Sequence, residues 1–122
     1  MQWPAYILTA LLLVFLWTKR AGLLPAKAGA AYLKNGAMLV DVRTASEFAS
    51  GHLPNAVNVP LGGIESALPR LVEDKKRVLL LHCQSGMRSG LAKRTLTRMG
   101  YTQVFNLGSL TRAESIVKAS LA

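Results

Sequence analysis

The chain reads Arg77-Val78-Leu79-Leu80-Leu81-His82-Cys83-Gln84-Ser85-Gly86-Met87-Arg88 in its second half, and Cys83 is its single cysteine. The apolar run before Cys83 predicts a buried strand, and the basic stretch after it predicts a helix. In a loop between a strand and a helix, backbone N–H groups and the positive end of the helix point toward the sulfur and lower its pKa. This order of strand, cysteine loop and helix therefore predicts a nucleophilic thiolate.

The far end of the predicted loop carries Arg88, which adds a fixed positive charge and a forked hydrogen-bond donor for an anionic substrate. The alternative is that Cys83 is a small buried hydrophobic residue, as lone cysteines commonly are, but a glycine and an arginine in register favour the loop. We therefore predict that Cys83 and Arg88 are catalytic. The residues predicted to bind the substrate are Gln84, Ser85, Gly86, Met87 and Arg88.

The length of the loop narrows the chemistry. Loops of the form His-Cys-x5-Arg are the tyrosine-phosphatase pattern, in which the loop must hold a whole tetrahedral phosphate. This chain has four residues between Cys83 and Arg88, one fewer than that pattern. A shorter loop should hold a smaller group, such as a sulfane sulfur bonded to the cysteine, so a phosphatase is the disfavoured alternative.

Two motif blocks in this order resemble the rhodanese family, and the resemblance covers about residues 28–120. The first block contains Leu39-Val40-Asp41-Val42-Arg43-Thr44, Glu47-Phe48, Gly51-His52-Leu53-Pro54 and Asn58-Val59-Pro60. The second block contains the cysteine loop, Gly100-Tyr101-Thr102 and Val104-Phe105-Asn106-Leu107-Gly108. The resemblance implies an α/β rhodanese-like fold, in which a small parallel sheet is flanked by helices on both faces.

The resemblance also implies a sulfurtransferase that uses no cofactor. The Cys83 thiolate would take a sulfane sulfur from thiosulfate or another persulfide donor, and a thiol, a protein or cyanide would accept the sulfur from the Cys83 persulfide. Arg88 would bind the sulfonate of the donor. Neutral Gln84 and Met87 make the loop less positive than in relatives with extra basic residues there. The alternative is a membrane-tethered interaction or sulfur-carrier module without thiosulfate turnover.

Other polar residues are expected to support the loop. The resemblance implies a structural ion-pair cluster of Asp41 and Arg43, with Glu47 as a further partner. His52 is expected to be a hydrogen-bonded turn residue, and the side chain of His82 is expected to point away from the centre of the loop. Two histidines, one cysteine and six scattered acids show no metal-ligand spacing.

Strand and helix patterns alternate along the rest of the chain, which predicts a parallel sheet covered on both faces. A capping box, Thr44 to Glu47, predicts the start of a short helix. Other helices are predicted over 26–34, 64–72, 88–99 and 111–119, and strands over 38–42, 56–59, 78–82 and 103–106.

The N-terminal segment 1–18 carries no charged side chain. We predict a transmembrane anchor over 1–20, a linker over 21–27 and the rhodanese-like domain over 28–122. Eighteen helical residues span about 27 Å, slightly less than the hydrocarbon core of about 30 Å, and interfacial tryptophans with Lys19 and Arg20 would cover the difference. A cleaved signal peptide and a buried core helix are the alternatives.

Charge and cysteine content bear on the location and the partners. The positive-inside tendency predicts a single-pass membrane protein whose catalytic domain is cytoplasmic, and a free thiol suits that compartment; a periplasmic or exported domain is the alternative. The net charge of +9 fits an anionic membrane surface or an anionic substrate. Nucleic acid is not expected, because no binding motif is present and few aromatic residues lie outside the N-terminal segment.

Overall fold

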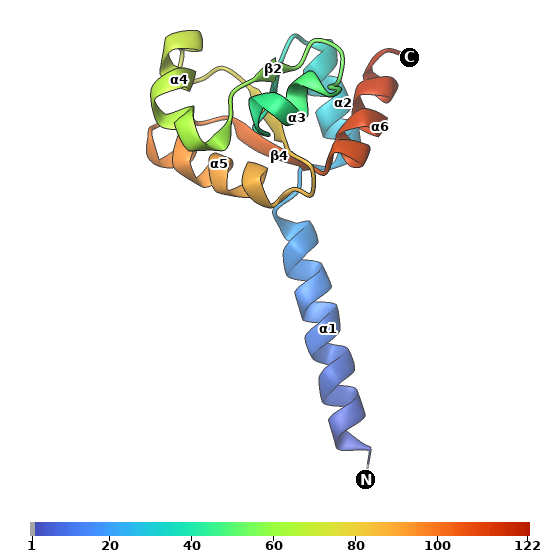
Figure 1. The fold of residues 1–122 in the computed structure, drawn as a ribbon. Coiled ribbons are helices and arrows are strands. Elements are labelled where there is room, and N and C mark those ends of the chain that lie inside the picture. Colours follow the sequence, from blue (N-terminus) through green and yellow to red (C-terminus); the bar gives the residue numbers. More distant parts are fainter. Residues whose placement is uncertain (1) are drawn as a thin grey trace.

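A computed structural model describes residues 2–122 of the chain, apart from the side chains of residues 18–21. Its centre is a parallel sheet of four strands in the order β2-β1-β3-β4 (Figure 1). The strands are β1 (Met38–Asp41), β2 (Val57–Asn58), β3 (Leu79–His82) and β4 (Val104–Gly108).

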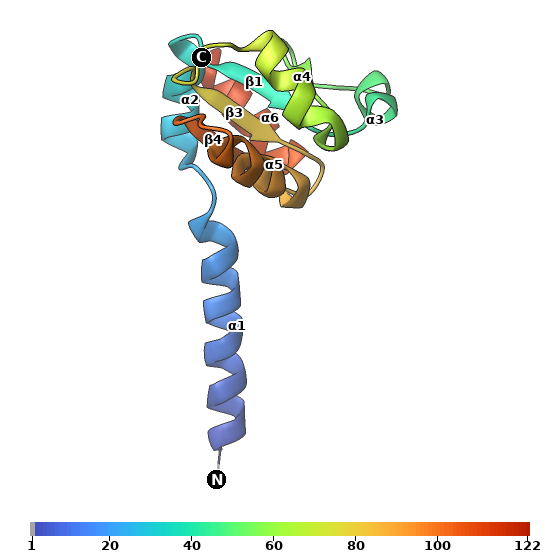
Figure 2. The same ribbon diagram turned by 90° about the vertical axis from the view of Figure 1, so that its left-hand side faces the viewer.

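Helices cover both faces of the sheet, as predicted (Figure 2). Helices α2 and α6 pack together on one face, whereas α4 and α5 lie on the other. The helical segments are α1 (Trp3–Ala21), α2 (Ala26–Lys34), α3 (Ala45–Ala49), a 3-10 turn η1 (Leu61–Gly63), α4 (Ile64–Leu71), α5 (Met87–Arg98) and α6 (Leu110–Ser120). Apart from α1, the predicted bounds of these helices and strands differ from the observed ones by no more than a few residues.

The central strand β3 shows how the two halves of the core form. All four of its residues are buried, and successive side chains of a strand point to opposite faces. Leu79 and Leu81 pack with the helices α4 and α5, whereas Leu80 packs with α2 and α6. A strand that is buried on both faces reads as a continuous apolar run. The same alternation turns Cys83 toward the α5 side of the sheet.

The register of the sheet brings the carboxyl ends of three strands to one edge. Asp41 of β1 lies opposite His82 of β3, and His82 lies opposite Gly108 of β4 after an irregularity between Leu81 and His82. Ligands of parallel sheets usually bind beyond this edge. The loops that follow β1, β3 and β4 therefore meet where the cysteine loop begins.

Part of the segment predicted as a linker, 21–27, contacts the sheet. Leu23 forms a parallel bridge with Asn106, and the Leu24 N–H donates to the Asn106 carbonyl oxygen at 3.0 Å. On the other side, the Arg112 guanidinium donates to the Leu24 carbonyl oxygen at 2.6 Å. Because of these contacts, the packed part of the chain begins at residue 23. The domain boundary predicted at residue 28 stays a prediction.

The predicted transmembrane helix is wrong. Helix α1 has 19 residues, but within the part of the chain that the structure describes, no helix is both long enough and apolar enough to cross a membrane. The reason is the short apolar run. Strongly apolar residues extend only from Ile7 to Leu16, with Thr9 among them, and ten helical residues span about 15 Å of a core of about 30 Å.

The predicted single-pass location, with the orientation derived from it, is wrong for the same reason. The predicted membrane contact through residues 1–20 is not supported. The interfacial roles predicted for Lys19 and Arg20 lie outside the side chains that the structure describes.

The buried core makes one prediction about stability. Leu80 has no exposed surface, so Leu80→Ala should lower the free energy of unfolding by about 2–5 kcal/mol through lost burial and a residual cavity. Urea unfolding of the full chain, followed by circular dichroism, measures this loss. Leu71→Ala is the matched control, because Leu71 is 54% exposed and its truncation should cost less than about 0.5 kcal/mol. Equal losses for the two variants would contradict this account of the core.

Candidate active site

The cysteine loop lies between β3 and α5 and is attached to the turn that joins β4 to α6. The Cys83 N–H donates to the Gly108 carbonyl oxygen at 3.2 Å. The Leu110 N–H donates to the Gln84 carbonyl oxygen at 3.3 Å, and Ser85 pairs with the same turn through an antiparallel bridge. The loop is thus held by backbone contacts to a segment more than twenty residues later in the sequence.

A glycine at position 86 is required for two reasons. Gly86 has φ +97°, in the left-handed region that L side chains rarely adopt. In addition, a Cβ atom on Gly86 would lie 3.2 Å from the Gly108 Cα atom. The loop can therefore approach the β4–α6 turn only if residue 86 has no side chain, and this approach directs the Gly86 N–H toward the sulfur.

The sulfur of Cys83 accepts hydrogen bonds from the loop. The Gly86 N–H donates to Sγ at 2.9 Å, and the Ser89 Oγ atom lies 3.5 Å from it. Burial opposes ionisation of the thiol, but hydrogen bonds from the Ser89 hydroxyl and from the amides of Ser89, Gly86 and Ser85 outweigh it and lower the pKa of Cys83. The loop is therefore built to stabilise negative charge on the sulfur.

Asn106 of β4 holds this arrangement in place. Its side-chain oxygen accepts hydrogen bonds from the Ser89 hydroxyl at 2.7 Å and from the Gly108 N–H at 2.9 Å, and its amide nitrogen donates to the Gly86 carbonyl oxygen at 3.2 Å. One nearly buried side chain thus joins the cysteine loop, α5 and the β4–α6 turn. No role was predicted for Asn106 from the sequence, although a polar residue inside a buried strand needs hydrogen-bond partners and is for that reason a signal.

The Ser89 hydroxyl has one hydrogen atom and three acceptors within reach: Asn106 Oδ1 at 2.7 Å, the Gly86 carbonyl oxygen at 3.2 Å and Cys83 Sγ at 3.5 Å. While the sulfur is protonated, these distances favour a hydrogen bond from the Ser89 hydroxyl to Asn106 Oδ1, the nearest acceptor. A negative charge on the sulfur would make it the stronger acceptor, because hydrogen bonds to ionised groups are stronger than neutral ones. Ser89 can therefore respond to the charge on Cys83 by rotating its hydroxyl.

Arg88 forms a two-pronged ion pair with Glu47, from α3 to α5. Its two terminal nitrogens donate to the two carboxylate oxygens at 2.6 and 3.0 Å. Hydrogen bonds from Arg88, and then from the Thr44 backbone N–H, lower the pKa of Glu47 from 4.5 to about 2. The expected partnership of Glu47 with Asp41 and Arg43 is thus not the one observed: Glu47 pairs with the loop arginine, and its carboxylate also accepts from Thr44 in the predicted capping box.

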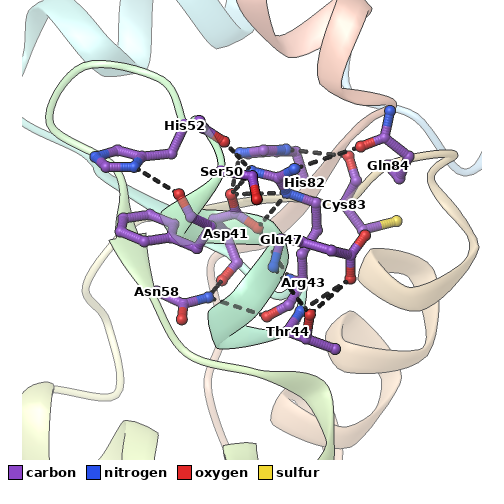
Figure 3. A network of polar contacts seen from close by, with 12 residues as sticks. Asp41, Arg43, Thr44, Glu47, Ser50, His52, Asn58, His82, Cys83 and Gln84 are labelled. Atoms are coloured by element: carbon purple, nitrogen blue, oxygen red, sulfur yellow. Dashed lines mark hydrogen bonds and ion pairs between the residues drawn. The ribbon is translucent and has the colours of Figure 1, made fainter.

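Asp41 and Arg43 form the expected ion pair below the loop (Figure 3). The Arg43 guanidinium contacts both carboxylate oxygens of Asp41 at 2.9–3.1 Å, and it also donates to the Gly51 carbonyl oxygen at 2.7 Å. A weaker contact, 3.4 Å, joins Arg43 to the side-chain oxygen of Gln84 in the cysteine loop. Both charged side chains are buried. Through the contacts to Gly51 and Gln84, this pair links β1, the turn after α3 and the cysteine loop.

The two histidines lie as expected. The His52 Nδ1–H donates to the Phe48 carbonyl oxygen at 2.9 Å, and the ring stacks on the Phe48 ring, so His52 is a hydrogen-bonded turn residue. His82 is fully buried, with Nδ1 3.2 Å from the Cys83 carbonyl oxygen and Nε2 3.6 Å from Asp41 Oδ2. Burial lowers the pKa of His82, so its ring is neutral at neutral pH and faces away from the sulfur.

The structure brings the predicted loop residues together around one sulfur, but these residues differ in their exposure to solvent. Gln84, Ser85 and Met87 are exposed at the surface of the loop, whereas Cys83 has no exposed surface. In this structure the sulfur is therefore covered. Within the described residues, no group of three or more histidine, cysteine, aspartate or glutamate side chains could hold a metal ion.

Comparison with known proteins identifies the family. A family model described as the Rhodanese-like domain matches residues 25–112. The chain belongs to the rhodanese-like family. Among solved structures, the human single-domain sulfurtransferase TSTD1 superposes with a TM-score of 0.66 at 28% identity, over 80% of this chain and 96% of that one.

Two curated relatives of this rhodanese-like chain carry functional names. The thiosulfate sulfurtransferase PspE of Escherichia coli (strain K12) is 37% identical over 71 residues, which are 58% of this chain and 68% of that protein. A putative sulfur carrier protein, YrkF of Bacillus subtilis (strain 168), is 35% identical over 69 residues, which are 57% of this chain and 36% of that protein. The names of these relatives support rhodanese-type sulfur transfer in general.

The Arg88–Glu47 ion pair predicts a pH dependence of stability. The folded-state pKa of Glu47, about 2, lies below the ordinary value of 4.5, so the pair contributes stability that is fully present above about pH 4.5 and is lost as the pH falls toward about 2. Glu47→Gln keeps a capping-box side chain but loses the charge. Its melting temperature should lie below that of the wild type at pH 7, and the gap should close toward pH 2.

The matched control for this experiment is Glu73→Gln, because Glu73 is exposed and forms no ion pair among the described residues. This variant should follow the wild type at every pH. A gap for Glu47→Gln that stays constant from pH 7 to pH 2 would contradict the account.

The hydrogen bonds to the sulfur predict the direction of a pKa change. Ser89→Ala removes the hydroxyl near Sγ, so the apparent pKa of Cys83 should rise. The rate of alkylation by iodoacetamide, measured against pH, reports this pKa. Ser85→Ala is the control, since the backbone amide of Ser85, not its hydroxyl, acts on the thiol. An unchanged profile for Ser89→Ala would mean that the amides alone stabilise the thiolate.

Proposed function

We propose that this rhodanese-like chain is a sulfurtransferase that works through a persulfide on Cys83. In the first step the Cys83 thiolate attacks the outer sulfur of thiosulfate or of another sulfane donor. A sulfur–sulfur bond forms to Cys83, the bond inside the donor breaks, and its electron pair leaves on sulfite or on the donor thiolate. In the second step an acceptor thiolate or cyanide attacks the outer sulfur, and the Cys83 thiolate leaves with the bonding pair.

One observation carries this proposal: the backbone N–H of Gly86 and the Ser89 hydroxyl both lie within hydrogen-bonding reach of Cys83 Sγ. The thiolate is the nucleophile in sulfur chemistry, and a lowered pKa makes it available at neutral pH. Preorganised amides also stabilise negative charge on a sulfur attached to the cysteine. Membership of a family whose named relatives include a thiosulfate sulfurtransferase supports the same reaction.

The proposed roles of the loop residues differ from those that spacing alone suggests. Cys83 is the nucleophile, and the backbone of residues 84–87 surrounds the transferred sulfur. Arg88 is mainly a positioning residue, because its charge is paired with the Glu47 carboxylate, which accepts from both terminal nitrogens. An anionic donor would have to compete with a carboxylate held at 2.6 Å for the same guanidinium.

This ion pair favours a second candidate within the same chemistry. With Arg88 neutralised by Glu47, the loop offers little unpaired positive charge to the two negative charges of thiosulfate. A persulfide donor needs no sulfonate site, so a sulfur carrier that is loaded by a persulfide rather than by thiosulfate fits the loop equally well. The likeness to a putative sulfur carrier protein agrees with this candidate.

The experiment that tests the proposal is intact mass spectrometry of the full chain after incubation with thiosulfate or, separately, with glutathione persulfide. We expect a gain of one sulfur atom that cyanide or dithiothreitol removes and that Cys83→Ser abolishes. Ser85→Ala, in the same loop, should keep the gain. A gain with glutathione persulfide alone would select the carrier, and no gain from either donor in a folded chain would overturn the proposal.

A further inference from the structure

Helix α5 exposes one continuous stripe that starts at the cysteine loop. The stripe consists of Met87, Leu91, Arg94 and Arg98, at positions i, i+4, i+7 and i+11, which lie on one side of a helix. All four side chains are exposed, and Met87 and Leu91 have exposed fractions of 70% and 51%. We call these four residues the α5 stripe. Its apolar half is nearest to Cys83, and its basic half is farther along the helix.

The basic half of the stripe has no internal counter-charge. Helix α5 contains no acidic residue. Arg94, Arg98 and the neighbouring Lys93 form no ion pair with any carboxylate among the described residues, whereas Arg43, Arg88 and Lys118 each do. Three unpaired cations on one helix attract a partner of negative charge.

The stripe borders a groove that reaches the cysteine loop. The groove encloses about 930 Å³. Its lining includes all four stripe residues together with Gly86, whose N–H contacts the sulfur, and Asn106, which holds the loop. A molecule that lies along the stripe therefore reaches the cysteine loop, whose Gly86 and Met87 line the groove.

We propose that the α5 stripe is the docking surface for an acidic protein that carries the acceptor thiol. This inference rests on the proposed sulfur transfer and names the class of acceptor. Acidic side chains of the partner would lie against Arg94 and Arg98, and an apolar side chain would cover Met87 and Leu91. Methionine and arginine are enriched in protein interfaces. A single-stranded nucleic acid fits less well, because the stripe offers no aromatic side chain on which a base could stack.

The docked thiol completes the second step of the reaction. Its thiolate forms a bond to the outer sulfur of the Cys83 persulfide, the bond between that sulfur and Cys83 Sγ breaks, and the electron pair remains on Sγ. One thiolate and one persulfide anion are consumed, and one of each is produced, so no external oxidant or reductant is required. The loop amides then hold the regenerated Cys83 thiolate.

The test uses the full chain and two synthetic peptides. One peptide contains a cysteine, leucines and alternating glutamates; the other has glutamine in place of each glutamate. We expect the acidic peptide to accept sulfur from the Cys83 persulfide about tenfold faster at low salt, because complementary charge raises association rates. The advantage should vanish near 1 M salt, where the Debye length is about 3 Å.

Two double variants locate the effect. Arg94→Gln/Arg98→Gln should remove most of the preference for the acidic peptide. Lys27→Gln/Lys34→Gln removes the same charge from exposed positions on α2, on the opposite face of the sheet. This variant should retain the preference for the acidic peptide. Transfer to cyanide should be unchanged in both variants, since cyanide needs no docking surface.

Binding separates this proposal from the sulfur-transfer proposal. The anisotropy of a labelled acidic peptide without cysteine is measured on the resting chain, so docking is tested even if no persulfide forms. Tighter binding than that of the glutamine peptide, lost only in Arg94→Gln/Arg98→Gln, supports the inference. Equal binding of both peptides, or equal losses in the two double variants, would overturn it. An oligothymidine that binds more tightly than the acidic peptide, with the same variant dependence, would overturn it in favour of nucleic acid.

Discussion

The contact on which the site depends is the hydrogen bond from the Gly86 N–H to the Cys83 sulfur, 2.9 Å long. It exists because Gly86 adopts a left-handed conformation and lies against the backbone of Gly108. Asn106 fixes both sides of that approach through its side-chain amide. The surroundings of the Cys83 sulfur are therefore set from β4 and the turn after it, and a change in that segment should alter the pKa of a residue far away in the sequence.

The Arg88–Glu47 ion pair changes the role that the sequence suggests for the loop arginine. An arginine at the end of such a loop suggests an anion site, but here its charge is already paired with a carboxylate that accepts from both terminal nitrogens. The pair joins α3 to α5 and so braces the end of the loop. The positive charge that remains unpaired near the site lies instead farther along α5, at Lys93, Arg94 and Arg98. This displacement of charge, from the loop to the helix surface, suits a large acidic partner better than a small anionic donor.

The α/β class, the helices on both faces of the sheet and the place of the cysteine loop could be predicted, because continuous apolar strands, capping signals and the strand–loop–helix order are local features. The transmembrane helix was wrong because the absence of charge in 1–18 is not the same as apolarity: only Ile7 to Leu16 is strongly apolar. The partner of Glu47 was also missed, since nothing local relates it to an arginine forty-one residues later.

The sequence by itself determined the candidate nucleophile Cys83, the short loop around it and the glycine in that loop, because these follow from residue types that stand next to one another. Only the tertiary structure decided which charges meet and which stay unpaired. Parallel strands bring the ends of β1, β3 and β4 to one edge, and this places Asn106 against Ser89 and Glu47 against Arg88. Such pairs depend on the packing of distant segments, so they cannot be predicted from residue spacing along the chain.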